Sequence, residues 1–307
     1  MLSEKEEYRI IHGDCIKVMA DMPAQSVDFA VFSPPFPLVY AYQSDPGDLG
    51  NSEDLSHEAP LHFSWFFRGL LRVLKPGRAA ICHCTQIPLL RRSGLFGLCD
   101  FRGLLIRIAQ RCGLQYEYDW MIRVNPQAQA IRTHSHHLQF AGMEKDRAQC
   151  RGALGMYLIK FMAPGENAVP VDGAGEISRN DWIKLAEGCW SDIVETDTLN
   201  VKEARSPEDT RHICPMQLGI YERCIRLYTN PGELVMDPFA GVGSCGFVAL
   251  GGESPKTHRY IHQSRKFLGI EMKQEYHRVA AKNCKRAIKM RENRSKGSLF
   301  PDFAESR

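Results

Sequence analysis

The chain has 307 residues, of which 39 are lysine or arginine and 36 are aspartate or glutamate, so its formal net charge is only +3. Hydrophobic residues make up 44% and charged residues 24%, an ordinary globular composition that excludes a disordered, collagen-like or strongly polybasic chain. No window of about 18 to 20 apolar residues could span a membrane, and the acidic start Met1–Glu7 lacks the apolar core of a secretory signal. We therefore expect a cytoplasmic protein without membrane contact, built as two small domains or one large one.

The 11 cysteines do not indicate a disulfide framework or a zinc ribbon. Their number is odd, they extend from Cys15 to Cys284, and no Cys-x-x-Cys pair occurs. The alternating Cys82-His83-Cys84 and the histidines within 134–137 suggest metal, but no second ligand pair stands at zinc-like spacing. We expect no bound metal and interpret most of the thiols as small buried apolar groups.

The first 125 residues alternate segments typical of strands with segments typical of helices. In chain order, we expect strands at 10–14, 27–32, 79–82 and 116–124, and helices at 16–22, 63–74 and 101–112. Pro23 stops the first helix, Lys75-Pro76-Gly77 stops the second, and Gly113 caps the third. Strands that alternate with helices predict a mostly parallel sheet with helices on its faces.

Regular periodicity is weak between residues 126 and 205, where glycine, proline, histidine and charged side chains are frequent. A loop of this length is too long for a compact core, so we interpret residues 126–205 as an inserted recognition region. Regularity returns with a helix at 216–227, a strand at 233–236, a helix ending at 250, a strand at 267–270 and a basic helix to about 290. Too few residues follow Glu271 to complete a doubly wound sheet, so the N-terminal part must supply its other strands.

A glycine-rich turn separates one of these predicted strands from the helix after it. Following Asp237, the residues Gly241, Gly243 and Gly246 match the pattern G-x-G-x-x-G, with the acidic Glu271 beyond. The turn could serve only to pack the helix on the strand, but its context favours a nucleotide site. Asp237 would repel a diphosphate such as that of NAD and would suit an ammonium or sulfonium group. S-adenosylmethionine is therefore the favoured ligand, and Glu271 could accept hydrogen bonds from its ribose hydroxyls.

A second strand end carries the segment Ser33-Pro34-Pro35-Phe36. The two prolines could act only as a stop signal for the strand. They also lack N–H groups, so this corner presents carbonyl and hydroxyl acceptors without competing donors, and Pro34 keeps Ser33 extended. The ring of Phe36 follows where a planar base could stack. These features favour a site for an amino group attached to an aromatic ring.

With these motifs in this order, the chain resembles the β-type, permuted DNA amino-methyltransferases, in which the catalytic motif precedes the recognition region and the cofactor motif comes last. The matching segments are Gly13-Asp14-Cys15, Ser33 to Phe36, Arg72 to Gly77, His212-Ile213-Cys214-Pro215, Asp237 to Ser244 and Phe267 to Glu271. The resemblance implies an α/β fold with a Rossmann-like, seven-stranded mixed sheet. It also implies S-adenosylmethionine as cofactor and a target base flipped out of double-stranded DNA. Serine at position 33 is the version associated with N4-cytosine methylation.

The resemblance further implies a domain organisation and a set of site residues. Residues 1–125 would form the catalytic half of the domain, 126–205 the target-recognition insert, 206–290 the cofactor-binding half, and 291–307 a basic, flexible tail. The expected catalytic residues are Ser33, Pro34, Pro35 and Phe36, and the expected cofactor-binding residues are Asp14, Cys15, His212, Pro215, Asp237, Pro238, Phe239, Gly241, Gly243, Ser244 and Glu271. Ser244 and Cys214 depart from the pattern, because many members have threonine and lysine there.

DNA contacts must come from local charge, because the net charge is modest. Lys145, Arg147 and Arg151 in the insert are the favoured candidates, whereas the basic stretch 282–294 is equally well explained as a solvated helix face. The leading hypothesis is an N4-cytosine DNA methyltransferase. The alternatives are N6-adenine methylation on the same scaffold and an inactive DNA-binding relative. Carbon-5 methylation is disfavoured, because the Pro-Cys dipeptide typical of those enzymes is absent.

Some properties stay open at this stage. The resemblance is compatible with a restriction–modification system, in which a cognate restriction enzyme would be a partner, and with a solitary or prophage enzyme. The target DNA sequence and the choice between monomer and homodimer cannot be read from the residues.

Overall fold

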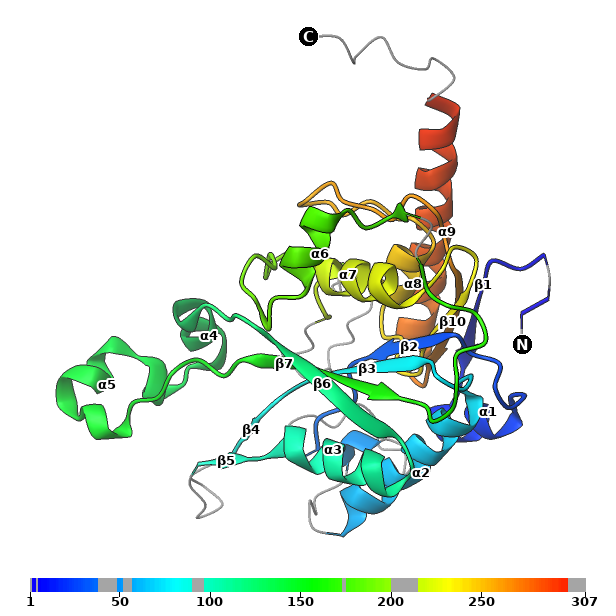
Figure 1. The fold of residues 1–307 in the computed structure, drawn as a ribbon. Helices are drawn as coiled ribbons and strands as arrows, with labels where there is room; N and C mark the ends of the chain where they lie inside the picture. Colours follow the sequence, from blue (N-terminus) through cyan, green and yellow to red (C-terminus); the bar gives the residue numbers. More distant parts are fainter. Residues whose placement is uncertain are drawn as a thin grey trace.

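In the computed structural model, the chain forms a central sheet with helices on both faces (Figure 1). The structure describes residues 2–3, 5–37, 49–51, 57–89, 97–172, 175–199 and 215–297. The strand order in the main sheet is β1-β10-β9-β2-β3-β7-β6-β8. In that order, the strands span Tyr8–His12, Lys266–Glu271, Leu234–Asp237, Phe29–Phe32, Ala79–Thr85, Met156–Met162, Gln115–Ile122 and Cys189–Trp190. Two further short strands, β4 (Ile87–Pro88) and β5 (Leu98–Cys99), form a separate pair.

The sheet is mixed, as predicted. From β1 through β10, β9 and β2 to β3, neighbouring strands are parallel, whereas β7 is antiparallel to both β3 and β6. We call the edge at which β1, β10, β9, β2 and β3 end the carboxyl edge. Because β7 runs against its two neighbours, β6 also ends and β7 begins at the carboxyl edge.

Helices cover both faces of the sheet. One face carries α1 (Cys15–Asp21), α2 (Glu58–Val73) and α3 (Phe101–Arg111), and the other carries α7 (Leu218–Tyr228), α8 (Ser244–Ala249) and α9 (Gln274–Gly297). Each helical layer shares a hydrophobic cluster with the sheet, the first cluster under α1–α3 and the second under α7–α9. On β2, Ala30 and Phe32 belong to the first cluster, whereas Phe29 and Val31 belong to the second. Burial on both faces explains why such strands are continuous apolar runs.

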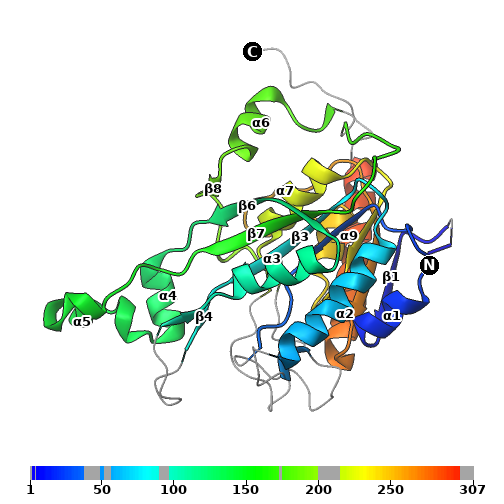
Figure 2. The same cartoon turned by 60° about the horizontal axis from the view of Figure 1, so that its bottom comes forward.

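The chain between β6 and β7 projects from the sheet as an arm, residues 123–155 (Figures 1 and 2). The arm contains α4 (Pro126–Thr133), α5 (Phe140–Lys145) and the 3-10 turns His136–Leu138 and Arg147–Gln149. Asn125 caps α4 with its side chain, and Pro126 occupies the first turn. At the base of the arm, the Gln129 side chain bonds both backbone groups of Leu154: its Nε2 donates to the carbonyl oxygen (3.1 Å) and its Oε1 accepts from the amide (2.9 Å). These bonds hold the two ends of the arm together at its base.

Three expectations about organisation need correction. The sheet has eight strands rather than seven, because β8, which follows α6 (Arg179–Leu185), pairs with β6. Residues 126–205 are not one insertion, because β7 lies within this range and in the sheet between β3 and β6. Residues 291–297 belong to α9, so the tail expected at 291–307 is wrong for its first part. Residues 298–307 lie outside the described residues.

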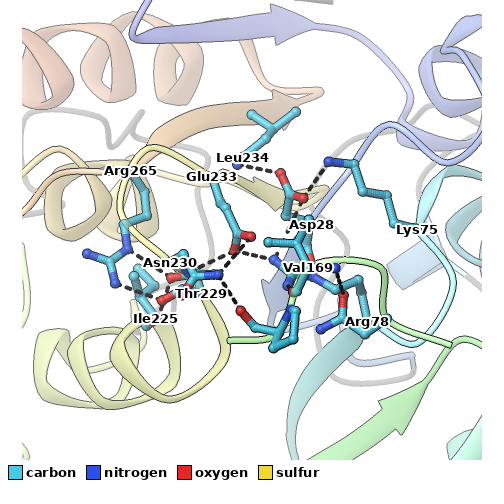
Figure 3. Close-up of polar contacts among 12 residues, drawn as sticks. Asp28, Lys75, Arg78, Val169, Ile225, Thr229, Asn230, Glu233, Leu234 and Arg265 are labelled. Atoms are coloured by element: carbon cyan, nitrogen blue, oxygen red, sulfur yellow. Dashed lines mark hydrogen bonds and ion pairs between the residues drawn. The ribbon is translucent and has the colours of Figure 1, made fainter. Parts of the chain in front are cut away.

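At the edge opposite the carboxyl edge, a network of charges joins the two halves of the chain (Figure 3). Asp28, just before β2, accepts a hydrogen bond from the amide of Leu234 in β9 (2.9 Å) and forms an ion pair with Lys75 (2.5 Å). Arg78 is only 3% exposed; it pairs with Asp28 and Glu233 and donates to the carbonyl oxygen of Asp28 (2.9 Å). Each of these charged groups has a partner of opposite sign. We therefore interpret the network as structural, holding the start of β2 against the start of β9.

The cysteines in the described residues are all free. Cys82 and Cys84 alternate along β3 and lie in the first cluster, where burial raises the pKa of both thiols. No group of three or more histidine, cysteine, aspartate or glutamate residues forms a potential metal site within the parts of the chain that the structure describes. The same residues contain no helix that is both long and apolar enough to cross a membrane.

Candidate active site

The motifs singled out in the sequence lie in a row along the carboxyl edge. β2 pairs with β9, β9 with β10, and β10 with β1, all in parallel. Because parallel strands end at the same edge, Ser33, Asp237, Glu271 and Asp14 follow one another across the sheet. The helices after β2 and β9 lie on opposite faces, an arrangement at which open α/β sheets bind ligands.

Aromatic rings join the glycine-rich loop to the end of β2 and to α2. The ring centroid of Phe239, in the glycine-rich loop, lies 5.9 Å from that of Phe32, the residue before Ser33. It lies 5.0 Å from the centroid of Phe66 in α2. The glycine-rich loop therefore packs against the end of β2, directly before Ser33.

Ser33 has a buried side-chain partner that the sequence did not indicate. Phe32 on β2 lies opposite Cys82 on β3, so the next residues, Ser33 and His83, are also adjacent. The Nδ1 atom of His83 lies 3.3 Å from Ser33 Oγ. Ser33 is partly exposed, whereas His83 and Pro34 are buried. The hydroxyl of Ser33 is thus held between the core and the surface.

The ring of Phe36 is half-buried at the end of the same motif. It packs against Phe101 of α3, with centroids 5.6 Å apart and planes tilted by 49°. Part of the Phe36 ring therefore belongs to the first cluster, and only the remainder is accessible to a ligand.

Asp237 is fully buried at the end of β9. One carboxylate oxygen accepts a hydrogen bond from the amide of Phe239 (3.0 Å), and the other accepts from the hydroxyl of Tyr221 (3.4 Å). Burial raises the pKa of Asp237 to about 7. A carboxyl group in this state ionises readily when a cation is placed beside it.

The three glycines of the G-x-G-x-x-G pattern have different structural roles. Gly241 has a φ of 53°, and a Cβ there would meet only a backbone oxygen at 3.9 Å, so this part of the loop is open to close approach. Gly243 has a φ of 80°, and a Cβ would lie 2.9 Å from Ala280 Cα in α9. A Cβ at Gly246 would lie 2.5 Å from the ring of Phe267. Gly243 and Gly246 therefore serve packing, and Gly241 alone leaves room for a ligand.

Backbone amides hold the carboxylate of Glu271 in place. The amides of Gly241 and Lys273 each donate to one of its oxygens, both at 2.8 Å. Two strands away from β9, Asp14 caps α1 by accepting a hydrogen bond from the amide of Ile16 (2.8 Å). Carboxylate oxygens have further lone pairs, so both groups can still accept hydrogen bonds from a ligand.

Two polar atoms beside this row are buried without a partner among the described residues. They are Ser244 Oγ, in the first turn of α8, and Gln217 Oε1, immediately before α7. Because α7 leads back into β9, its first turn lies at the carboxyl edge. A buried polar atom without a hydrogen bond is unfavourable by about 1–3 kcal/mol, so a ligand that pairs with it would be stabilised. Gln217 was not among the residues expected from the sequence.

The other expected cofactor-binding residues have varied positions. Cys15 lies in the first cluster with a buried thiol, which leaves only its backbone for a ligand contact. Pro238 is buried, and Pro215 is partly exposed just before α7. His212 lies outside the described residues, as does Cys214. The cofactor roles of all these residues stay predictions.

The arm leaves the sheet at the carboxyl edge, because β6 ends and β7 begins there. Lys145 and Arg147 are exposed on it, and Arg151 is partly exposed with its guanidinium donating to the carbonyl oxygen of Gly152 (2.9 Å). Phe140 is 69% exposed beside them. The arm thus presents cations and an apolar ring on the same side of the protein as Ser33.

Part of the basic stretch in α9 has structural partners. Arg291 forms an ion pair with Glu7 (2.7 Å), and the Arg294 guanidinium lies 3.9 Å from the ring centroid of Tyr260. α9 packs beside β1 and β10, whereas the arm projects from the far side of the sheet (Figure 1). These two basic regions therefore cannot be one continuous surface.

Comparison with known families supports a function for this site. A family model described as DNA methylase, N6_N4_Mtase, matches residues 27–282. This range contains both loops, the arm and the first part of α9, so the match covers most of the carboxyl edge and not only the sheet.

The individual proteins that match the chain share only a low sequence identity with it. The chain is 22% identical over 278 residues to the DNA adenine methyltransferase YhdJ of Escherichia coli K12, a match that covers 88% of this chain and 80% of that protein. It is 27% identical over 128 residues to the type II methyltransferase M.BglI of Bacillus subtilis, which covers 41% of this chain and only 30% of that protein.

Two solved structures share the fold. A protein of Thermus thermophilus described as a DNA modification methylase, TTHA0409, superposes with a TM-score of 0.65 at 18% identity, covering 92% of this chain and 96% of that one. The PvuII DNA methyltransferase, described as cytosine-N4-specific, gives a TM-score of 0.62 at 18% identity, covering 98% of this chain and 89% of that one. At these identities the likeness establishes the α/β methyltransferase fold.

Proposed function

Because this chain belongs to the DNA methylase family, we propose that it methylates the exocyclic N4 of cytosine in double-stranded DNA, with S-adenosylmethionine as the methyl donor. The observation that carries the proposal is the position of Ser33 and Asp237 at the ends of paired strands. One strand end offers uncharged acceptors that suit an amino group. The other offers a buried carboxyl group that suits a cation.

The residues at the ends of β9 and β10 fit the polar groups of S-adenosylmethionine. Asp237 would face its positive charge, and Ser244 Oγ and Gln217 Oε1, both buried without a described partner, would pair with its carboxylate and ammonium groups. Glu271, already oriented by two amides, would accept from the ribose hydroxyls. When bound, the cofactor supplies an electrophilic methyl group on a positively charged sulfur.

The chemistry on the protein side is positioning. The lone pair of an exocyclic amino nitrogen is delocalised into the base, so the nitrogen is a poor nucleophile. Hydrogen bonds from the amino group to Ser33 Oγ and the Pro34 carbonyl oxygen would favour a pyramidal nitrogen whose lone pair points at the methyl group. The base must leave the duplex, which is unfavourable by a few kcal/mol. Stacking on the accessible part of Phe36, worth about 1–3 kcal/mol, would offset part of this.

The choice of base rests on Ser33. A serine at the first position of the motif is what the resemblance associates with N4-cytosine methylation, and the PvuII enzyme of the same fold is described as cytosine-N4-specific. Adenine N6 is the second candidate, because the E. coli relative that aligns over 88% of this chain is described as an adenine methyltransferase. Both targets present an amino group to the same acceptors.

The arm is the proposed DNA-recognition element. It begins at the carboxyl edge, and its exposed Lys145 and Arg147 suit phosphate contacts. The exposed ring of Phe140 suits contact with base edges or base steps. The similarity to the type II methyltransferase of B. subtilis supports a restriction–modification setting, with a cognate restriction enzyme as partner.

Mass spectrometry of digested nucleosides tests the proposed function. Purified protein is incubated with S-adenosylmethionine and DNA from a strain without methylation, and the DNA is then digested. We expect N4-methyldeoxycytidine from the wild-type protein and a strongly reduced amount from the Ser33→Ala variant. N6-methyldeoxyadenosine would support the second candidate instead, and the absence of any methylated nucleoside would contradict both.

A further inference from the structure

His83 is a buried polar residue that the proposed chemistry does not yet use. It lies on β3 between Cys82 and Cys84, but its side chain points to the opposite face of the sheet from theirs, because successive strand residues alternate. It is 8% exposed, and each of its ring nitrogens has one polar side-chain contact among the described residues. Its Nδ1 lies 3.3 Å from Ser33 Oγ, and its Nε2 lies 3.3 Å from Met156 Sδ in β7.

The protonation state of His83 follows from this environment. The described contacts of its ring are a hydroxyl and a thioether, neither of which carries charge. Burial lowers the pKa of His83 to about 4, so the ring is neutral at physiological pH. A neutral imidazole has one nitrogen that donates a hydrogen bond and one that accepts.

Met156 determines which nitrogen carries the proton. A thioether sulfur has no hydrogen to donate and can only accept, so the contact at 3.3 Å is favourable only if Nε2 carries the hydrogen. Nδ1 is then unprotonated and accepts. The one donor within its reach among the described residues is the hydroxyl of Ser33. The hydroxyl proton of Ser33 is therefore directed toward β3 and away from the proposed base.

We propose that His83 is a positioning residue that holds the Ser33 hydroxyl proton, so that the Ser33 oxygen presents only lone pairs to the amino group of the target base. This inference rests on the proposed function. It adds the hydrogen bond that makes a neutral serine act as an acceptor toward the base. A hydroxyl can donate or accept, and without a fixed partner its proton could point at the substrate. With the opposite His83 tautomer, Nδ1 would donate to Ser33, and the hydroxyl proton would face the base and repel its amino hydrogens.

Two substitutions of similar polarity separate this role from packing. In His83→Asn, the shorter amide places an acceptor near the position of Nδ1, within reach of Ser33. In His83→Gln, the amide extends toward the position of Nε2 and Met156 instead. We expect His83→Asn to keep the single-turnover methylation rate within roughly fivefold of wild type, and His83→Gln to lose roughly tenfold to a hundredfold, the effect of one misdirected hydrogen bond. The dissociation constant for S-adenosylmethionine should be the same in both.

A double-substitution cycle tests whether His83 acts through Ser33. In the Ser33→Ala background, replacing His83 by glutamine should cause no further loss of rate, because the hydroxyl that it orients is gone. Independent, multiplicative losses would overturn the proposal. Equal losses in His83→Asn and His83→Gln would overturn it as well, since they would point to packing alone.

The tautomer can be measured without any methylation. In protein labelled with ¹⁵N at histidine, the two ring nitrogens of His83 should show a neutral ring protonated at Nε2 at pH 7. The signal of Nδ1 should move in Ser33→Ala, which removes its donor. A ring protonated at Nδ1, or a charged ring, would contradict the proposal even if the wild-type enzyme methylates cytosine. If the nucleosides show no methylation at all, the proposed function fails while this measurement still decides the tautomer.

Discussion

Asp237 couples cofactor binding to pH. Burial raises the pKa of this carboxyl to about 7, and the Glu271 carboxylate acts in the same direction, whereas the bonds from Phe239 and Tyr221 oppose the shift. A cation bound beside Asp237 lowers the pKa again, so the cofactor binds the ionised form. Affinity should therefore fall as the pH drops below about 7, by up to about tenfold per pH unit, and binding there should release a proton.

Isothermal titration calorimetry in buffers of different ionisation enthalpy measures both effects. Asp237→Asn is the matched control, because it keeps the shape and one acceptor oxygen but cannot ionise. It should bind S-adenosylmethionine more weakly and without dependence on pH between 6 and 8. A wild-type affinity that is equally independent of pH would remove the proposed contact between Asp237 and the cofactor.

A substitution at Phe36 distinguishes stacking of the target base from packing of the side chain against Phe101. Phe36→Leu keeps an apolar side chain against Phe101 but lacks a π face, so we expect it to lower the methylation rate by roughly fivefold to a hundredfold. Thermal denaturation should show nearly unchanged stability, and calorimetry an unchanged affinity for S-adenosylmethionine. A methylation rate equal to wild type would mean that the base does not stack on this ring.

The site residues that the sequence predicted belong to local motifs, whereas those that it did not predict depend on the fold. Ser33, Asp237 and Glu271 stand at strand ends in motifs that can be recognised locally. His83 contacts Ser33, which lies 50 residues earlier in the chain, and the side-chain oxygen of Gln217 is buried without a described partner. No local pattern reveals either feature. The Cys-His-Cys alternation drew attention to His83 as a metal candidate, whereas its contacts are Ser33 and Met156.

Among the elements, the arm is expected to carry DNA affinity. Replacing Lys145 and Arg147 together by glutamine should weaken DNA binding and lower the slope of log affinity against log salt by about 2, because each lost phosphate contact removes about 0.9. Fluorescence anisotropy with a labelled duplex, measured across salt concentrations, gives both quantities. Cofactor affinity should not change.

A second basic element provides the matched control. Lys285 and Lys289 on α9 are exposed, and their replacement by glutamine removes the same charge from the other side of the sheet. This variant should keep the wild-type salt slope. If it loses DNA affinity and the arm variant does not, α9 rather than the arm is the contact.

Prediction of strands succeeded where a short apolar run is bounded by clear turn or helix signals, even when its partners are distant in sequence, as with β9 and β2. β7 was missed, although Met156–Met162 is largely apolar, because it follows a long irregular arm and was included in the same insertion. The short β8 is defined by its pairing with β6 and has no periodicity of its own. α9 extends past residue 290, where Arg291 forms an ion pair with Glu7 and Arg294 contacts the ring of Tyr260.

For the whole molecule, the network at the opposite edge should determine stability but not activity. Arg78→Met leaves the carboxylates of Asp28 and Glu233 without their buried partner, so we expect a loss of about 3–5 kcal/mol in the free energy of unfolding. Urea denaturation measures this loss. Cofactor affinity, measured on the folded variant, should be unchanged because the carboxyl edge is not altered.

Lys75→Met is the control at the same edge. The Lys75 side chain is 44% exposed, so its ion pair with Asp28 should contribute less than about 1 kcal/mol. Equal losses in the two variants would contradict the view that Arg78 is the buried centre of the network.

The order of the strands explains why the site could be anticipated. Parallel strands end at one edge, so motifs at the ends of β2, β9 and β10 had to meet once the sheet was recognised. The strand count and the position of β7 could not be derived in this way, because strands added beyond β3 leave the order of these strand ends unchanged.

Methyl transfer from labelled cofactor tests the central claim, that the loops at Ser33 and Asp237 form one site, most directly. DNA is incubated with S-adenosylmethionine that carries a deuterated methyl group, using wild-type protein, Ser33→Ala and Asp237→Asn, and the nucleosides are analysed by mass spectrometry. We expect the deuterated methyl group on cytosine N4 with the wild-type protein and strongly reduced transfer with each variant. Undiminished transfer in both variants, or label on carbon 5, would contradict the account.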